Sequence, residues 1–261
     1  MRIALSLEYD GSGFCGFQSQ KAGCGVQDAL EDALAAIAGC AVRVAPAGRT
    51  AAGVHATAQI VHADVPADRP VTAWVRGVNA HLPEPVAIRW AHPVPDRFHA
   101  RYSASARHYT YLLLARPERP GLIARRAGWY HRPLDLPAMR QAAGLLVGEH
   151  DFSSFRAAGC QARSPVKTLA RLDVSRTGEI FRLDFSANAF LHHMVRNLVG
   201  ALVVVGAGKA PPHWIAELLA ARDRARAAPT FAPDGLYFVG ADYPDEFGLP
   251  ATRRDPTLVS A

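Results

Sequence analysis

The sequence contains no long apolar run and no closely spaced pair of cysteines. No apolar stretch approaches the ~18 residues that a membrane-spanning helix requires, so we expect no transmembrane segment. The chain becomes acidic at Glu8, too soon for the apolar core of a signal peptide. Its four cysteines form no C-x-x-C pair, which argues against a zinc ribbon or a redox motif. These absences predict a cytoplasmic protein with reduced thiols.

The composition is that of an ordinary soluble globular protein. The 261 residues are 49% hydrophobic and 20% charged, which is enough for one large domain or two small ones. Lysine and arginine exceed aspartate and glutamate, giving a formal net charge of +6. Such an excess favours a polyanionic partner, because each cation at a phosphate releases condensed counterions.

The residue pattern predicts an α+β protein. Alternating apolar residues, such as Ile3, Leu5 and Leu7, indicate half-buried strands, and stripes with a period near 3.6 indicate helices. Strands are predicted at residues 2–8, 40–46, 58–64, 86–90, 107–115, 169–174, 180–185 and 236–241. Helices are predicted at residues 26–38, 74–80, 136–148, 190–205 and 212–225.

These elements fall into two halves. The first half reads β-α-β-β-α-β, a ferredoxin-like order, and the second half loosely repeats it. We therefore expect two α+β halves with antiparallel or mixed sheets and a cleft between them. Asp135 and Asn188 are the expected N-caps of two second-half helices. The polar tail after Pro250 is expected to be frayed.

A glycine-bearing loop at residues 47–57 separates two of the predicted strands. It holds Gly48, Gly53, Arg49 and His55 among small residues, with too little apolar bulk to build a core. Functional sites are often carried on such loops, which a rigid scaffold holds in place. The alternative is a plain connection between strands.

The fourth predicted helix is apolar around most of its surface, apart from His192, His193, Arg196 and Asn197. A buried arginine is costly unless it is paired, so Arg196 should meet an anion or extend its guanidinium to the helix edge. The two histidines lack a third metal ligand at a useful spacing, so histidines packed in the core are the better interpretation. A metal-dependent hydrolase that also used His55 and His62 would require a bound metal, and we expect none.

Tyr109 and Tyr111 share one face of a predicted strand. Both could pack in the core, or they could form a stacking platform for a nucleic acid base. Basic residues next to aromatic ones recur nearby and favour nucleic acid. These runs are Arg97-Phe98-His99, Arg101-Tyr102 and Arg107-His108-Tyr109.

Several short runs in family order resemble the bacterial tRNA pseudouridine synthase A family over nearly the whole chain. They are Tyr9-Asp10-Gly11, Ala47-Gly48-Arg49-Thr50, Ala52-Gly53-Val54-His55, Gly77-Val78-Asn79-Ala80, Phe98-His99-Ala100-Arg101, Asp151-Phe152-Ser153-Ser154-Phe155-Arg156, Asn188-Ala189-Phe190-Leu191-His192-His193-Met194-Val195-Arg196-Asn197 and Gly235-Leu236-Tyr237.

This resemblance implies an isomerase that converts uridine to pseudouridine at positions 38 to 40 of the tRNA anticodon stem-loop. It further implies the pseudouridine synthase fold, a homodimer that shares the tRNA, and no metal or organic cofactor. The N-terminal half, residues 1–101, would carry the catalytic loop at residues 47–57. The C-terminal half, residues 102–261, would carry Tyr109, Arg196 and the dimer interface.

The resemblance also implies roles for individual residues. Arg49 would enter the stem and hold the flipped nucleotide, and His55 belongs to the same RNA-binding set. Tyr109 would stack on the uracil and act as a catalytic residue in the later proton removal, and Leu236 would line the uracil pocket. Arg196 would pair with the catalytic carboxylate. Base flipping fits this reaction, because the glycosidic bond is inaccessible inside a stem.

The loop departs from the family at one position. The family reads G-R-T-D-A-G-V-H where this chain reads Gly48-Arg49-Thr50-Ala51-Ala52-Gly53-Val54-His55, so Ala51 replaces the catalytic aspartate. A methyl group offers neither a nucleophile nor a base, and the loss of such a group costs several orders of magnitude in rate. Asp10 and Asp64 are the nearest acids in sequence, and nothing in the sequence brings them within reach.

We therefore expect a chain that folds, dimerises and binds tRNA without isomerising it. Because Arg49, Tyr109 and Arg196 are intact, the pattern favours a deliberate or very recent single substitution over an old pseudoenzyme. The alternative is a natural non-catalytic tRNA-binding or tRNA-folding protein of the same fold, in which Ala51 is the native residue.

Overall fold

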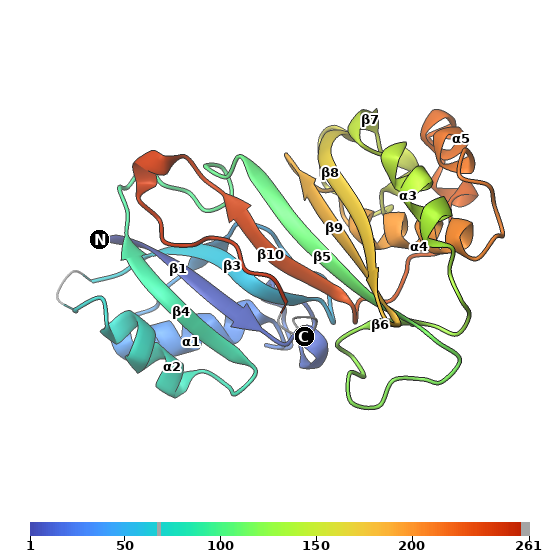
Figure 1. Ribbon diagram of the computed structural model, residues 1–261. Helices are drawn as coiled ribbons and strands as arrows, with labels where there is room; N and C mark the ends of the chain where they lie inside the picture. Colours follow the sequence, from blue (N-terminus) through green and yellow to red (C-terminus); the bar gives the residue numbers. More distant parts are fainter. Residues whose placement is uncertain (67–68, 257–261) are drawn as a thin grey trace. The chain divides into compact units, whose positions relative to one another are not determined.

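The computed structural model describes residues 1–66 and 69–256 (Figure 1). Contacts divide the chain into two compact units, of which the first is Met1–Arg107 with Tyr237–Ala261 and the second is His108–Leu236. No helix in the described residues is long and apolar enough to cross a membrane.

The last strand returns to the first unit, so these units differ from a simple division at residue 101. The physical reason is its parallel pairing with a first-unit strand, in which Tyr237 lies opposite His55 and Phe238 lies opposite Ala56. A strand at the far end of the sequence thus completes the first unit.

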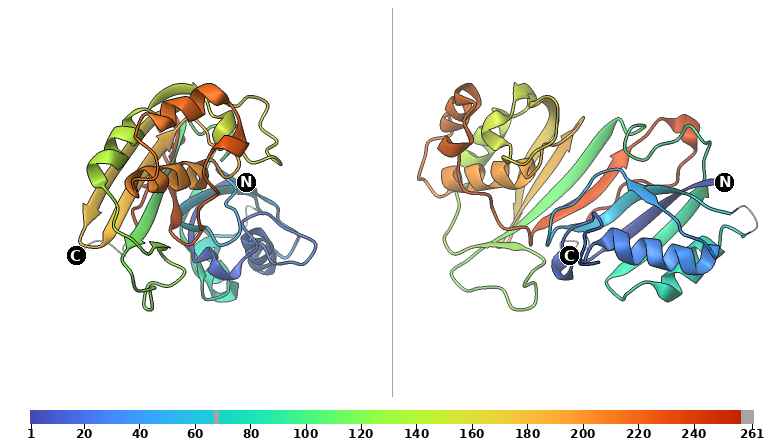
Figure 2. Two further views of the ribbon diagram at one scale, coloured as in Figure 1. Left: turned by 90° about the vertical axis from the view of Figure 1, so that its right-hand side faces the viewer. Right: turned by 180° about the vertical axis from the view of Figure 1, so that it is seen from behind.

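In the described residues, the first unit contains a mixed sheet and the α-helices α1 and α2. The bounds are β1 (Arg2–Tyr9), β2 (Val44–Pro46), β3 (His55–Asp64), β4 (Val86–Pro93), β10 (Leu236–Asp242), α1 (Val26–Ala38) and α2 (Val78–His81). The strand order is β4-β1-β3-β10, with β2 also paired to β3. α1 runs across one face of these strands (Figure 2, right). The order β1-α1-β2-β3-α2-β4 confirms the β-α-β-β-α-β pattern predicted for the first half.

The second unit holds the remaining elements. The bounds are β5 (Ala106–Ala115), β6 (Gly128–Tyr130), β7 (Gly148–Asp151), β8 (Val166–Thr177), β9 (Ile180–Ala187), α3 (Leu136–Gly144), α4 (Met194–Gly206) and α5 (Trp214–Ala221). The strand order is β5-β9-β8-β7, and β6 pairs with β5 in parallel. α3 packs against α4 and β8. The α+β fold class is therefore confirmed.

The central strand β1 is more deeply buried than its alternation predicts. Ile3, Leu5 and Leu7 have no exposed surface, but Ala4 and Ser6 on the opposite face have none either. The prediction of a half-buried strand was therefore wrong. β1 lies between β3 and β4 and pairs with both, so it is an interior strand of the sheet.

The C-terminal tail is docked rather than frayed up to Pro256. Arg254 donates its backbone N–H to the Val239 carbonyl at 2.9 Å, and Arg253 forms a bridge with Gly240. A Cβ at Gly240 would lie 2.2 Å from the Thr252 carbonyl oxygen, so glycine permits the close approach. Hydrogen bonds to β10 therefore hold a segment whose polar composition predicted fraying. Residues 257–261 lie outside the described residues.

α4 begins four residues later than predicted. His193 has a φ of 59°, a left-handed conformation that ends the preceding segment and precedes the first helical residue, Met194. Asn188 does not cap this helix, because its side-chain oxygen accepts from the backbone N–H groups of Thr168 and Ala189. His192 and His193 therefore lie in the connection before α4 and not, as predicted, in the same helix as Arg196.

α3 ends at Gly144, not at Gly148 as predicted. Gly148 instead opens β7 with a φ of 118°, a value that favours glycine. Asp135 is the N-cap as predicted, and its carboxylate accepts from the backbone N–H of Ala138. The short strand β7 has no distinguishing apolar alternation, so the sequence pattern did not indicate it.

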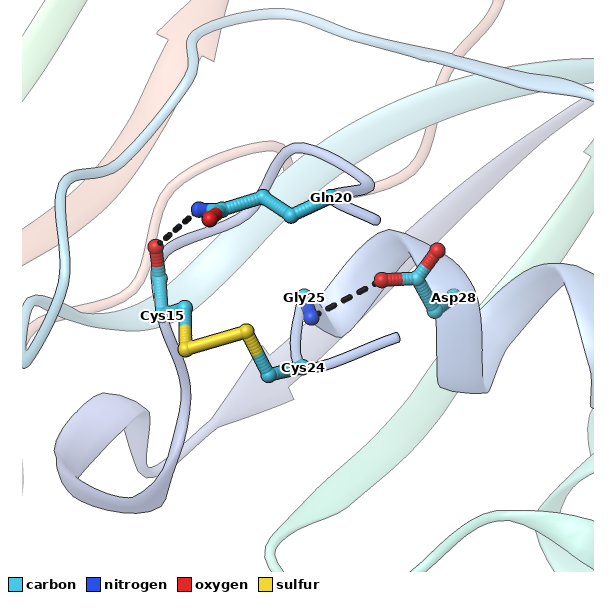
Figure 3. Close-up of a disulfide and its surroundings, with 5 residues drawn as sticks. All are labelled: Cys15, Gln20, Cys24, Gly25 and Asp28. Carbon is cyan, nitrogen blue, oxygen red and sulfur yellow. Dashed lines mark hydrogen bonds between the residues drawn. A yellow bond between two sulfur atoms is a disulfide. The ribbon is translucent and has the colours of Figure 1, made fainter. Parts of the chain in front are cut away.

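The expectation that all four cysteines are reduced was wrong for one pair. Cys15 and Cys24 form a disulfide with a Cα–Cα distance of 5.4 Å (Figure 3). Their backbones also meet, because the Cys15 N–H donates to the Cys24 carbonyl at 2.9 Å. The loop that brings them together is set by tertiary contacts, which a spacing rule for cysteine pairs does not detect. Cys40 and Cys160 are free thiols.

Reducing this disulfide should destabilise the protein measurably. The bridge joins residues nine apart, and closing a loop of that length restricts the unfolded chain by about 2–3 kcal/mol. We expect a lower midpoint of urea unfolding with reductant present. The double variant Cys15→Ser with Cys24→Ser should show the lower midpoint with or without reductant. Equal midpoints for the wild-type chain in both conditions would contradict the prediction.

Candidate active site

A tight connection joins β2 to β3, as predicted, but β3 begins at His55, three residues earlier than the predicted strand, so the last three residues of the segment 47–57 belong to β3. At its start the Ala47 N–H donates to the Ile60 carbonyl at 2.7 Å. At its tip the Val54 N–H donates to the Ala51 carbonyl at 3.1 Å, which closes a turn. Gly53 has a φ of 75° within this turn, a conformation that side chains disfavour. The backbone of the loop is therefore defined at both ends.

Side chains on this loop alternate between exposed and buried positions. Arg49 is exposed, Thr50 is buried and Ala51 is partly exposed. The guanidinium of Arg49 is thus available to a ligand. The methyl group of Ala51 carries no charge and no lone pair, so the position next to Arg49 and Thr50 contributes only backbone atoms to any reaction.

His55 lies beneath the loop rather than on its surface. Its side chain is 3% exposed and stacks on the Tyr237 ring with a centroid distance of 4.7 Å. Nδ1 accepts from the Gly11 N–H at 3.1 Å, and the Asp10 carboxylate also lies 3.2 Å from this nitrogen. An Nδ1 that accepts a hydrogen bond carries no proton to donate, so the Gly11 contact is the hydrogen bond in that tautomer. His55 therefore supports the loop from within the first unit.

Tyr109 and Tyr111 have different environments although they share a strand face. Tyr111 is fully buried in the second unit, and its hydroxyl donates to the Ala232 carbonyl at 2.9 Å. Tyr109 is partly exposed, and its ring meets Phe190 edge to face at 5.0 Å. Of the two tyrosines, Tyr111 belongs to the core, and Tyr109 keeps surface that a base can contact.

Arg196 lies in the first turn of α4 and is half-buried. Its Nε donates to the Phe231 carbonyl at 2.7 Å, and the Phe231 N–H donates back to the Arg196 carbonyl at 3.2 Å. Burial lowers the pKa of Arg196 from its ordinary value, while Tyr111 and Asp234 act in the opposite direction. The guanidinium is thus anchored at one nitrogen, and its remaining donors can serve an anion.

The segment from Phe231 to Tyr237 connects these groups along the chain. The Phe231 carbonyl accepts from the Nε of Arg196, and the Gly235 carbonyl accepts from the Leu112 N–H at 2.8 Å. A Cβ at Gly235 would lie 2.1 Å from the Leu112 carbonyl oxygen, so only glycine fits there. The next residue, Leu236, is buried, and Tyr237 is the ring partner of His55.

The four histidines of the metal hypothesis have different partners, and they are divided between the two units. In the first unit the Nδ1 of His62 accepts from the Ala100 N–H at 3.2 Å. In the second unit His192 and His193 face each other with ring centroids 3.9 Å apart. Over residues 1–66 and 69–256, no three His, Cys, Asp or Glu side chains are arranged to hold a metal ion.

Sequence reasoning assigned no role to Tyr9 or Gln59, although both contact the loop. Tyr9 lies 2.8 Å from the Thr50 hydroxyl, and Gln59 donates to the Gly48 carbonyl at 2.7 Å. Tyr9 belonged to a run that resembles the family, which was one available signal. Gln59 offered a weaker signal, as a polar residue at an interior strand position.

A family model described as tRNA pseudouridine synthase matches residues 5–103 and 142–244, well over half of the chain. The chain belongs to the tRNA pseudouridine synthase family. The first matched stretch contains the loop with Arg49 and Ala51, and the second contains Arg196 and Leu236. Tyr109 lies between the two stretches.

Curated tRNA pseudouridine synthases are similar to this chain over almost its full length. The tRNA pseudouridine synthase A of Dechloromonas aromatica (strain RCB) is 61% identical over 255 residues, which cover 98% of this chain and 97% of that protein. The enzyme of the same name from Thiobacillus denitrificans (strain ATCC 25259 / T1) is 60% identical over 254 residues, with 97% and 98% covered. That of Methylobacillus flagellatus is 57% identical over 254 residues, with 97% of each covered.

Stability should fall as the pH is lowered through the histidine range. Burial lowers the pKa of both His62 and His193 to about 4. Below pH ~6.5 the unfolded chain therefore takes up protons that the folded chain excludes until pH ~4, and the free energy of unfolding decreases. We expect a lower urea midpoint at pH 5 than at pH 7.5.

Two variants test the origin of this pH effect. His62→Gln should show a smaller drop in midpoint between pH 7.5 and pH 5, because one excluded proton is removed. His213→Gln should leave the drop unchanged, since the side chain of His213 is 72% exposed. Identical midpoints of the unmodified chain at the two pH values would refute the assignment.

Proposed function

We propose that this chain binds the anticodon stem-loop of tRNA on a tRNA pseudouridine synthase scaffold but does not isomerise uridine, because Ala51 replaces the catalytic carboxylate. Membership of the family supports the tRNA substrate. The single observation that carries the loss of activity is the methyl group at position 51, within a loop whose backbone is otherwise well defined.

The chemistry explains why one carboxylate decides the outcome. Isomerisation breaks the bond between uracil N1 and the ribose, rotates the base and forms a bond from C5 to the same ribose carbon. C5 then loses its proton to solvent and N1 takes one up. Attack on the ribose, addition to the base and removal of a ribose proton all require an oxygen nucleophile or base. Alanine supplies none of these functions, so the barrier to the first step should remain high.

The two nearest acids in sequence already have partners, and Asp10 contacts the loop at the buried His55, 3.2 Å from its Nδ1. The Asp10 carboxylate accepts from both the backbone N–H and the hydroxyl of Ser12. Asp64 forms a two-pronged ion pair with Arg2, with both contacts at 2.8 Å. A catalyst displaced by ~1 Å can lose ~100-fold in rate, so neither acid is a credible substitute.

The remaining residues keep the roles that the resemblance implies. Arg49 inserts beside the flipped nucleotide, which its exposure supports. Tyr109 stacks on the uracil, Leu236 lines the uracil pocket and Arg196 offers its charge to an anion. His55, which the resemblance assigns to the RNA-binding set, contributes indirectly, because its buried side chain supports the loop. The protein works in the cytoplasm with its tRNA, which cell fractionation would check.

The second candidate is a natural tRNA-binding or tRNA-folding protein, and Ala51 itself is the observation that favours it. Both candidates bind tRNA, so binding does not separate them. Restoring the carboxylate does, because only a synthase scaffold keeps the geometry that a nucleophile at position 51 needs.

The decisive assay is tritium release from C5-labelled uridine in tRNA transcripts. The unmodified chain should bind tRNA and release essentially no tritium. Ala51→Asp should raise the rate at least about 10³-fold, because it restores the missing nucleophile or base. Ala51→Asn is the matched control, since it has a similar shape but no carboxylate.

Three outcomes would revise the proposal. Normal turnover by the unmodified chain would refute the loss of activity. Equal rates for Ala51→Asp and Ala51→Asn would favour the non-catalytic alternative. Unchanged tRNA affinity in Arg49→Ala, compared with the control Arg43→Ala, would remove the RNA-binding role of Arg49. Arg43 suits this comparison because it is exposed in the same unit but paired with Glu31.

The proposal includes a homodimer, which the resemblance implies. One chain has a mass of 28.1 kDa, so a dimer has twice this mass, about 56 kDa. Light scattering during size-exclusion chromatography should yield the larger value at micromolar concentration. A mass near that of one chain, at the concentrations used for tRNA binding, would exclude a stable dimer.

A further inference from the structure

The run Tyr9-Asp10-Gly11, at the end of β1, contacts the loop at residues 47–57 from below. A Cβ at Gly11 would lie 2.0 Å from the Val54 carbonyl oxygen, so this glycine lets the two backbones touch. The Gly11 N–H donates to His55, the first residue of β3. The run therefore meets the loop at its far end, where the chain enters β3.

Two buried side chains meet the loop at its near end. The Tyr9 hydroxyl lies 2.8 Å from the Thr50 hydroxyl, and both residues are buried. Gln59 has no exposed surface, and its Nε2 donates to the Gly48 carbonyl at 2.7 Å. The same Nε2 lies 3.4 Å from the Tyr9 oxygen, which links the two contacts.

These contacts bind the residues on both sides of Arg49. Gly48 is held through its carbonyl and Thr50 through its hydroxyl, and the Thr50 carbonyl also accepts from the Phe17 N–H at 3.0 Å. With positions 48 and 50 fixed inward, the backbone must direct Arg49 and the side chain at position 51 away from the core.

We propose that Tyr9 and Gln59 are positioning residues that set the direction of Arg49 and of the side chain at position 51. This inference rests on the proposed function, because it concerns the loop that carries the synthase chemistry. Neither residue touches the reacting atoms. They act through Gly48 and Thr50.

The protonation of Tyr9 suits this role. Burial raises the pKa of Tyr9 to about 12, so its hydroxyl keeps its proton at neutral pH. The Tyr9 oxygen can accept from Gln59 while its proton goes to Thr50. The side-chain oxygen of Gln59 is buried and has no hydrogen-bond partner among the described residues.

The first experiment uses the chain as it is and does not depend on catalysis. Amide hydrogen exchange would be measured at Phe17 and Val54, whose N–H groups bond to Thr50 and Ala51. Tyr9→Phe and Gln59→Met should each speed exchange there by at least about 10-fold. Tyr243→Phe is the matched control, because it also removes a tyrosine hydroxyl bond, to the Ala100 carbonyl, without touching the loop. It should leave both amides unchanged.

The second experiment measures the consequence in the Ala51→Asp background. Tyr9→Phe and Gln59→Met should lower kcat for tritium release by at least about 10-fold. The tRNA Kd should rise less than it does in Arg49→Ala, because Arg49 is redirected rather than removed. Thr50→Ser keeps the hydroxyl and should retain activity, whereas Thr50→Val should behave like Tyr9→Phe. Combining Tyr9→Phe with Thr50→Val should lower kcat no more than either change alone, because both changes remove the same contact between the two hydroxyl groups.

The two readouts separate the possible failures. Unchanged exchange at Phe17 and Val54 in both Tyr9→Phe and Gln59→Met would overturn the positioning role. A loss of kcat that the Tyr243→Phe control reproduces would also overturn it, because the effect would be one of general stability. Faster exchange together with no turnover by Ala51→Asp would support the positioning of the loop and refute the proposed function.

Discussion

The register between β1 and β3 is the constraint on which the candidate site depends. Leu7 lies opposite Gln59, and Tyr9 lies opposite Ala56, so the pairing shifts by one residue between these two positions. Such an irregularity re-aims the side chains that follow it. Here it brings Tyr9 at the end of β1 to Thr50, while Gln59 on β3 reaches the start of the same loop. A one-residue slip would turn these polar groups to the other face of the sheet.

The fold of the loop does not depend on the side chain at position 51. Position 51 is partly exposed, and its structural contribution is a backbone carbonyl that accepts from Val54. That contribution is the same for alanine and aspartate. The proposed reaction requires a carboxylate at position 51. The fold does not require it, because buried contacts at Gly48 and Thr50 hold the loop. Family membership consequently fixes the scaffold, whereas activity depends on the identity of one side chain.

The errors in reading the sequence share a physical cause. The Cys15–Cys24 disulfide, the docked tail at Arg253 and the late start of α4 all depend on contacts between distant residues or on a single backbone conformation. Composition and periodicity describe local preference, and tertiary contacts override it. Local signals were reliable where they coincided with packing, as in α1, which ends at Ala38 and is capped by Gly39 with a φ of 71°.

By itself the sequence determined the fold class, most of the strands and helices, the family and the presence of alanine at position 51. These follow from local periodicity and from residue identity, which need no coordinates. Only the tertiary structure separated the buried Tyr111 from the partly exposed Tyr109 and put His55 beneath its loop. Only it joined Tyr9 and Gln59 to the residues beside Arg49. A side chain's burial and its hydrogen-bond partners are properties of segments brought together by folding, so no local pattern in the chain specifies them.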